Sequence, residues 1–394
     1  MSEVAKLPQT ARETVSLEEQ VARLHALLEA SRQIHSNLAV DEVLTQTARI
    51  LVRELEVEGA LFLAAGGDQT IAAYGILPVA PFESCSKFPL VARDGRRLAQ
   101  LIVRTSAGCS LSEYEQDFIY SLVRQTSVAL EKATLHERDL RWARLQQDLD
   151  AARGVQRSLL PKSMPAIAGL SIAARTEACY EVGGDYLDAF AMPDGSQMFI
   201  VADVAGKGLA SAIVATSFRA AFRALATQPL SLAEMVGRVG QGHWEEGQEA
   251  RQRYVTAICV RFHAADATLE VVNAGHNPGL LVGPDGSVRM LEASGTPLGM
   301  LSDIRYSAEI VRFPAGSRLL LYTDGLTDVF CGDEEFGCER LTEAFCSLTT
   351  RDASESLQAL WKHLHRFSTG AQTDDMTALA IIHQAPGTEG THVP

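Results

Sequence analysis

Short apolar runs separated by turn residues occupy the second half of the chain and constrain its fold more than any other feature. The runs cover residues 196–202, 254–262, 269–272, 279–282, 318–322 and 378–382. Each has the length of a buried strand and is too short for an ordinary helix. Two segments with helical period, residues 209–227 and 354–367, lie between them. Strands this numerous and apolar predict two packed sheets with helices on the outside.

Aspartates stand at the ends of these strands. Asp203 and Asp324 each follow an apolar run, Asp185 lies in the segment EVGGDYLD, and Asp374 and Asp375 precede the last run. A single Asp-Gly at a strand end is usually a simple turn. Carboxylates from adjacent strands would instead converge at one edge, where like charges destabilise the fold unless cations bind them. Hard oxygen ligands without a cluster of His or Cys predict Mg²⁺ or Mn²⁺ rather than zinc.

The composition narrows the protein class. The 394 residues exceed one ordinary core and suggest at least two domains. The net charge of −14 disfavours nucleic acid and anionic membranes as partners, because both need a basic footprint. The seven scattered cysteines contain no CxxC pair and indicate reduced core residues. No signal sequence or apolar run of membrane-spanning length is apparent, so a cytoplasmic protein is expected.

The first 135 residues predict a helix followed by a compact α+β domain. Apolar residues recur at helical spacing from Leu17 to Leu38, which suits equally a coiled coil or a helix lying on a domain; this N-terminal helix is placed at residues 1–36. Residues 37–135 then predict a helix at 41–55, strands at 59–65, 69–74 and 98–104, and a helix at 112–131. This order resembles a GAF sensor domain, which implies small-molecule sensing or dimerisation. Cys85 and Cys109 could be chromophore or redox sites, although incidental loop cysteines are the simpler interpretation.

Residues 136–165 predict a helical linker. An apolar heptad stripe runs through a strongly charged stretch, formed by Leu135, Trp142, Leu145, Leu149, Ala152 and Leu159. Such a stripe is typical of a parallel coiled coil, which would join two protomers in a homodimer. Pro161 and Pro165 end the helix, because proline lacks the amide hydrogen that a helix needs. The strand-rich domain is therefore placed at residues 166–385, and the composition of residues 386–394 predicts a disordered tail.

Several motifs in this strand-rich domain resemble those of one enzyme family. EVGGDYLD, ADVAGKG, YVTA, NAGHNP, GTPLG, LLLYTDGLTD and DDMT follow each other in the order and approximate spacing of PPM/PP2C-like phosphatases of the SpoIIE/RsbU type. The resemblance runs from about Leu145 to His383. It implies an αββα sandwich, two Mn²⁺ or Mg²⁺ ions, and hydrolysis of phosphoserine or phosphothreonine on a protein. It also implies a bacterial signalling role, with anti-sigma-factor antagonist (STAS) proteins as substrates.

The resemblance assigns roles to individual residues. Asp185 and Asp203 should bridge or bind the metals, with the carbonyl of Val204 as an extra ligand, and Asp324 should complete one metal site. Of the last pair, Asp374 aligns best with the family's ligand, whereas Asp375 is either a further ligand or the residue that orients it. The implied mechanism is attack by a metal-bound hydroxide without a covalent intermediate.

The general acid of this implied reaction is unassigned. Eukaryotic relatives place a histidine just after the ADV-position aspartate, where this chain has Ala205. His276 is a candidate replacement, although a histidine between turn residues often just holds its loop by hydrogen bonds. Lys207 either meets the phosphate electrostatically or is an ordinary solvated loop lysine.

Two rival functions compete with the protein phosphatase. One is a catalytically silent sensor or scaffold that retains the phosphatase fold, and the other is a phosphoesterase for small molecules. A regulatory hypothesis accompanies the leading interpretation. The unbroken helical pattern from Ser112 to Leu160 suggests that a change in linker register repositions the motif around Asp185.

Overall fold

The computed structural model describes residues 9–55, 57–67, 69–106, 109–179, 182–368, 370 and 372–384. The chain divides into two compact units, Met1–Gln146 and Gln147–Pro394. The predicted tail at 386–394 and the first residue of the EVGGDYLD motif lie outside the described residues.

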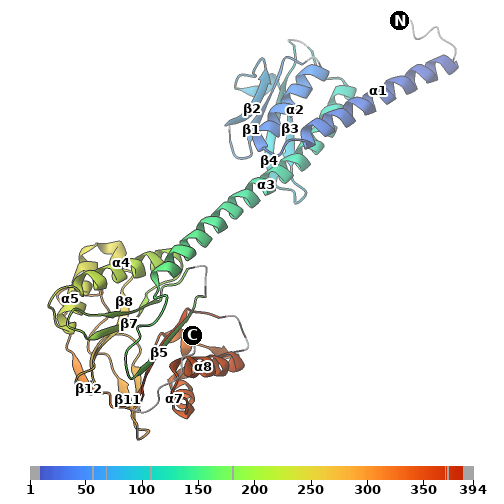
Figure 1. Ribbon diagram of the computed structural model, residues 1–394. Helices are drawn as coiled ribbons and strands as arrows, with labels where there is room; N and C mark the ends of the chain where they lie inside the picture. The colour runs from blue at the N-terminus through green and yellow to red at the C-terminus, as the bar shows by residue number, and fades with distance from the viewer. Residues whose placement is uncertain are drawn as a thin grey trace. The chain divides into compact units, whose positions relative to one another are not determined.

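The first unit is a four-stranded antiparallel sheet with helices packed on it (Figure 1). Its elements are α1 (Gln9–His35), α2 (Val40–Glu54), β1 (Gly59–Ala64), β2 (Thr70–Gly75), the 3-10 turn η2 (Phe82–Ser84), β3 (Ser86–Val91), β4 (Arg97–Arg104) and α3 (Glu113–Leu159). The strand order is β2-β1-β4-β3. Leu44 of α2, Phe62 of β1, Leu101 of β4 and Leu122 of α3 are fully buried in one core. The predicted helices and the three predicted strands are therefore present.

Strand β3 was not predicted. Its exposed and buried residues alternate, but Lys87 and Pro89 interrupt the apolar pattern. Proline cannot donate a ladder hydrogen bond and is tolerated at the edge of a sheet, which is where β3 lies. The GAF identity of this unit stays a prediction.

Helices α1 and α3 carry the two predicted coiled-coil stripes. In α1, Ala30 and Ile34 are buried in the domain core, whereas Leu24 and Leu28 are exposed. Helix α3 begins with the predicted capping box, in which Ser112 N donates to Glu115 Oε2 (2.7 Å) and Glu115 N donates to Ser112 Oγ (3.3 Å). Farther along α3 the stripe residues Leu135, Trp142 and Leu145 are exposed. The coiled coil and the homodimer stay predictions.

The second unit contains two five-stranded sheets. One sheet has the order β11-β10-β13-β16-β5 and the other β12-β9-β8-β7-β6. The first sheet is formed by β5 (Leu170–Glu177), β10 (Gly279–Val282), β11 (Val288–Leu291), β13 (Arg318–Tyr322) and β16 (Met376–His383). The second is formed by β6 (Tyr186–Ala191), β7 (Gln197–Val204), β8 (Val255–His263), β9 (Thr268–Ala274) and β12 (Glu309–Arg312).

Helices cover the outer face of each sheet (Figure 1). Helices α4 (Leu209–Leu225) and α5 (Leu232–Glu245) pack on the second sheet, followed by the short α6 (Gln248–Arg251). Helices α7 (Gly337–Ser347) and α8 (Ala353–Phe367) pack on the first sheet. The 3-10 turn η3 (Asp324–Leu326) and the small hairpin β14 (Phe330–Cys331) and β15 (Glu334–Glu335) precede α7. Between the sheets, side chains such as Phe199, Ile258 and Leu321 are fully buried, each worth about 1.5–3 kcal/mol of transfer free energy. The unit is thus an αββα sandwich.

The strand pairing brings the aspartate-bearing ends together. Tyr186 of β6 pairs with Ala202 of β7, so the residue before β6 and the residue after Ala202 lie at the same edge. Tyr322 of β13 pairs with Ala378 of β16, so the end of β13 and the start of β16 also meet. Each sheet therefore has two acidic segments side by side at one of its edges.

Within the part of the chain that the structure describes, no helix is both long enough and apolar enough to cross a membrane.

Candidate active site

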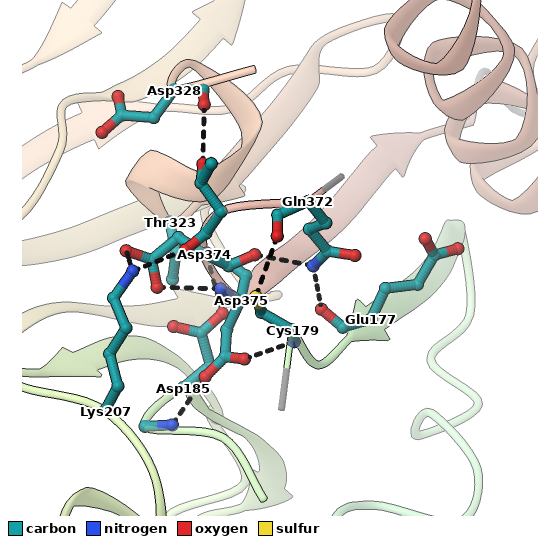
Figure 2. Close-up of polar contacts among 11 residues, drawn as sticks. Glu177, Cys179, Asp185, Lys207, Thr323, Asp328, Gln372, Asp374 and Asp375 are labelled. Atoms are coloured by element: carbon teal, nitrogen blue, oxygen red, sulfur yellow. Dashed lines mark hydrogen bonds and ion pairs between the residues drawn. The ribbon is translucent and has the colours of Figure 1, made fainter. Parts of the chain in front are cut away.

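A cross-sheet hydrogen bond joins the acidic segments. Thr323, which follows β13, donates from Oγ1 to Asp185 Oδ2 at 2.9 Å (Figure 2). Asp185 is buried just before β6 of the other sheet. A Cβ built on the neighbouring Gly184 would lie 3.1 Å from the Val204 carbonyl oxygen and 3.5 Å from Asp203 Oδ1. Asp185, Asp203 and the Val204 carbonyl therefore border the same small space.

Asp375 holds the loop that carries Asp185. Its Oδ1 accepts a hydrogen bond from Cys179 N (2.8 Å), and its Oδ2 accepts one from Gly184 N (2.7 Å) (Figure 2). A Cβ on Gly183 would lie 2.5 Å from Asp375 Oδ2, so only glycine permits this approach. Since both carboxylate oxygens are engaged by backbone amides, the geometry favours the orienting role for Asp375 over the ligand role.

Asp374 points toward a lysine. Its Oδ2 lies 2.8 Å from Lys207 Nζ, and its Oδ1 accepts a hydrogen bond from Asp375 N at 2.9 Å (Figure 2). Lys207 Nζ also donates to the Thr373 carbonyl at 2.5 Å. Lys207 is therefore more than a solvated loop lysine, because its ammonium connects the β7–α4 loop to the segment before β16.

Burial and mutual repulsion act on the carboxylates. Burial first, and then Asp203, raise the pKa of Asp185 well above its ordinary value. Burial, followed by the charges of Asp324, Asp374 and Asp375, raises the pKa of Asp203 to about 7. The pKa of Asp324 is also raised, by burial and then by Asp328 and Asp374. Like charges are thus close enough to penalise one another, which is the situation that a divalent cation relieves.

The donor chemistry suits a hard cation, although the side chains are not arranged around one. Among the residues described, no group of three or more His, Cys, Asp or Glu side chains already has the geometry to hold a metal ion. Asp374 is paired with Lys207, and Asp375 is paired with backbone amides. The remaining donors are carboxylate and carbonyl oxygens, which Mg²⁺ and Mn²⁺ prefer. If Asp374 were a ligand of such an ion, the ion would compete with Lys207 for its carboxylate.

His276 lies just behind the site with both ring nitrogens engaged. Thr256 Oγ1 is 2.8 Å from Nδ1, and the Tyr322 carbonyl is 3.0 Å from Nε2. Burial lowers the pKa of His276 to about 4, so the ring is neutral near pH 7. A neutral ring must donate from Nε2 to the carbonyl and accept at Nδ1. The geometry favours the loop-holding interpretation of His276 over a general acid.

Three contributors to this site were not anticipated. Gln156 of α3 makes a double contact with Gly183: Nε2 donates to the carbonyl oxygen (2.7 Å), and Oε1 accepts from the amide (3.2 Å). Thr323 provides the cross-sheet bond, and Asp328 contributes charge next to Asp324. Asp328 lies four residues after Asp324 in the LLLYTDGLTD motif, so the sequence could have indicated that the two aspartates lie close together. Nothing in the local sequence marks Gln156, since its partner is 27 residues away.

Comparisons with known proteins agree with this architecture. A family model described as Stage II sporulation protein E (SpoIIE) matches residues 193–384. The phosphoserine phosphatase RsbP of Bacillus subtilis (strain 168) is 29% identical over 187 residues, which are 46% of this chain and 46% of RsbP. The second unit is similar to SpoIIE/PP2C phosphatase domains.

Solved structures of this PP2C fold superpose on the same region. The SiaA-PP2C domain of Pseudomonas aeruginosa gives a TM-score of 0.55 at 22% identity, covering 61% of this chain and 97% of that chain. A Mycobacterium tuberculosis structure of RsbU and RsbW domains gives a TM-score of 0.50 at 28% identity, covering 58% of this chain and 64% of that chain. The predicted αββα fold is thereby confirmed. The SpoIIE match begins after Asp185, and the aligned region is less than half of RsbP.

Proposed function

We propose that this SpoIIE/PP2C domain is a metal-dependent phosphatase for phosphoserine or phosphothreonine on a partner protein. One observation carries the proposal: acidic residues from both sheets of the sandwich meet at one edge, where Thr323 of one sheet bonds Asp185 of the other. The raised pKa values of Asp185, Asp203 and Asp324 indicate that this crowding is unfavourable without a cation. Similarity to RsbP, which is named a phosphoserine phosphatase, supports the same reaction.

The residues divide into those that would hold two ions and those that hold the site together. Asp185, Asp203, the Val204 carbonyl, Asp324 and Asp374 are the proposed ligands of two Mn²⁺ or Mg²⁺ ions. When bound, such ions lower the pKa of a water molecule and neutralise charge on phosphoryl oxygens. Asp375 keeps the Asp185 loop in place through the amides of Cys179 and Gly184.

The proposed substrate is a phosphorylated signalling protein, specifically an anti-sigma-factor antagonist of the STAS type. RsbP is a curated relative of this domain, and RsbU and RsbW domains occur together in one of the similar structures. The proposed role is therefore bacterial signal transduction under control of the first unit.

The test is phosphate release from a phospho-STAS protein with and without Mn²⁺, using wild type, Asp203→Asn and the matched control Asp266→Asn. Asp266 is an exposed aspartate in the turn between β8 and β9. We expect Mn²⁺-dependent release by wild type and Asp266→Asn, and loss of release by Asp203→Asn. If wild type releases phosphate equally well without a divalent ion, the proposed metal chemistry is wrong.

The same assay separates the rival functions. A scaffold would release no phosphate from any substrate, and Asp203→Asn would change nothing. A small-molecule phosphoesterase would turn over p-nitrophenyl phosphate or a nucleotide much faster than the phosphoprotein. Side-by-side values of kcat/KM on the two substrate types therefore decide between the three functions.

Regulation through the linker helix is a second part of the proposal. The double hydrogen bond between Gln156 and Gly183 supports it, because movement of the end of α3 would pull on the loop that carries Asp185. We expect Gln156→Ala to change turnover, whereas Gln147→Ala, at an exposed position of the same helix, should not.

Linker insertions provide an independent test. Inserting about four residues shifts the heptad phase, whereas inserting about seven restores it. Turnover that changes with the first insertion and recovers with the second supports control by helix register. Equal turnover in both variants and wild type would contradict it.

A further inference from the structure

A cavity of about 510 Å³ opens beside the candidate active site. Three segments line it: the start of the β14–β15 hairpin, the C-terminal end of α8 and the residues just before Asp374. Gly325, which follows Asp324, and Thr373, which precedes Asp374, both belong to its wall. The cavity therefore shares its wall with two of the acidic segments.

The lining contains a group of apolar side chains. Val329 and Phe330 come from the hairpin segment, Leu364 from α8, and Met376 from the start of β16. Phe330 is 40% exposed, and the turn and second strand of its hairpin carry the acidic residues Asp333, Glu334 and Glu335. Polar side chains share the wall with this apolar group, namely those of Asp328, His365, Ser368, Gln372 and Thr373. A concave surface that combines a partly exposed aromatic side chain with polar groups is typical of a binding site.

Hydrogen bonds tie the cavity wall to the acidic residues. Thr373 Oγ1 donates to the Asp328 carbonyl (3.3 Å), and the Thr373 carbonyl accepts from Lys207 Nζ (2.5 Å). Gln372 Nε2 donates to the Asp374 carbonyl at 2.6 Å and to the Glu177 carbonyl at 2.9 Å (Figure 2). The cavity and the candidate metal ligand Asp374 are thus connected through the backbone of residues 372–374.

We propose that this cavity binds an apolar side chain of the phosphoprotein substrate, one to three residues from the phosphoserine. The proposal rests on the phosphatase function proposed above. The occupant follows from the position of the cavity: a phosphoserine held at the acidic edge has its neighbouring residues within reach, because an extended chain advances about 3.3 Å per residue. The volume accommodates a leucine, methionine or phenylalanine side chain.

The experiment uses pairs of phosphoserine peptides that differ only in having leucine or glutamine at one position, scanned over the three residues on each side. The full-length protein is assayed with Mn²⁺ as wild type, Phe330→Ser, Phe330→Leu and the control Ile310→Ser. Ile310 is 74% exposed on the edge strand β12. p-Nitrophenyl phosphate serves as the reference substrate.

At one position we expect wild type to prefer the leucine peptide by about tenfold or more in kcat/KM, as is usual when an apolar pocket is filled. Phe330→Ser should reduce this preference toward one, and Phe330→Leu and Ile310→Ser should keep it. Absence of any preference in wild type, or the same preference in Phe330→Ser, would overturn the proposal. An equal loss on peptides and p-nitrophenyl phosphate in Phe330→Ser would show that the hairpin only supports the site. Absence of Mn²⁺-dependent release from every substrate would instead contradict the phosphatase function itself.

Discussion

Two buried aspartates at opposite ends of one short segment have very different partners. Asp188 is fully buried in β6, and Arg223 of α4 binds it through Nε (2.7 Å to Oδ2) and Nη2 (2.6 Å to Oδ1). The Tyr186 hydroxyl and the Ala189 amide also donate to it, each at 2.9 Å. Asp185, only three residues earlier, accepts a hydrogen bond from the Thr323 hydroxyl, while burial and then the charges of Asp203 and Asp375 raise its pKa.

The difference separates a carboxylate whose charge is compensated within the fold from one whose charge is not. A buried charge is tolerated when a cation and hydrogen bonds compensate it within the protein. Asp188 has that compensation inside the fold, so it stabilises the packing of α4 on the sheet. Asp185 and its acidic neighbours repel one another, so an external cation is the natural source of compensation.

The largest expected effect comes from Asp324→Asn. Removing a proposed metal ligand should lower kcat/KM for the phosphoprotein about a thousandfold, or about 4 kcal/mol of transition-state free energy. The free energy of unfolding without metal should stay the same or rise, because one repelling charge is gone. Steady-state kinetics and urea unfolding measure the two quantities. If metal-free Asp324→Asn were several kcal/mol less stable than metal-free wild type, Asp324 would stabilise the fold as Asp188 does, and the contrast between the two kinds of aspartate would be wrong.

Arg223→Met should show the opposite pattern. It leaves Asp188 buried without its cation. Because the Arg223 side chain is itself partly exposed, the free energy of unfolding should fall by about 2–4 kcal/mol. Adding Asp188→Asn should restore part of the loss. Urea unfolding of the metal-free protein checks both variants. The comparison fails if the single variant is as stable as wild type.

His276 adds a third buried titratable group, one that is compensated by neutral partners. Its pKa of about 4 lies below the ordinary value near 6.5, so below about pH 6.5 the unfolded chain binds a proton that the folded protein does not. The neutral buried ring therefore contributes fully to the free energy of unfolding above pH 6.5. About 2 kcal/mol of this stability is lost as the pH falls from about 6.5 to about 5.

The measurement for His276 is the difference in unfolding free energy between wild type and His276→Gln as a function of pH. The difference should shrink as the pH falls through this window, since the variant has no ring to protonate. A difference that does not vary with pH would mean that the ring has the same pKa in the folded protein and in the unfolded chain.

The smallest effect is expected for Lys207→Met. Lys207 forms an ion pair with Asp374. Because both side chains are partly exposed, this pair contributes at most about 1 kcal/mol to the free energy of unfolding. Its removal should tighten Mn²⁺ binding about two- to fivefold, because the ion no longer displaces an ammonium group. Isothermal calorimetry measures this directly, with Lys207→Arg as the charge-retaining control. Weaker Mn²⁺ binding by Lys207→Met would show that the lysine orders the site.

Local sequence patterns predicted six strands (β7, β8, β9, β10, β13 and β16) and two helices (α4 and α8) of the second unit. Strands β10 and β13 have the predicted bounds, and α8 begins one residue before its prediction, because each is an uninterrupted apolar run or a clear amphipathic helix. Helices α5, α6 and α7, strands β5, β6, β11 and β12, and the short hairpin β14–β15 were not predicted. For α5 a signal was present, since Ser231 and Glu234 form a capping box ahead of an apolar face. Strand β3 had no comparable signal, because its proline breaks the pattern.

The candidate site was predictable only in part. The aspartates were recognisable from their places at strand ends and from their motifs. The separate role of each aspartate was not predictable. Asp375, for example, accepts hydrogen bonds from the amides of Cys179 and Gly184, which lie 196 and 191 residues away in the sequence. The Lys207–Asp374 pair and the cavity beside Phe330 depend in the same way on segments that only the folded chain brings together.

Local periodicity and residue type were sufficient to predict the long apolar strands, their buried faces and the acidic residues near their ends. The tertiary structure alone decided which carboxylate meets a cation, which meets an amide and which meets another carboxylate. The reason is physical: the free energy of a buried charge depends on neighbours within a few ångströms in space, and here those neighbours come from opposite sheets.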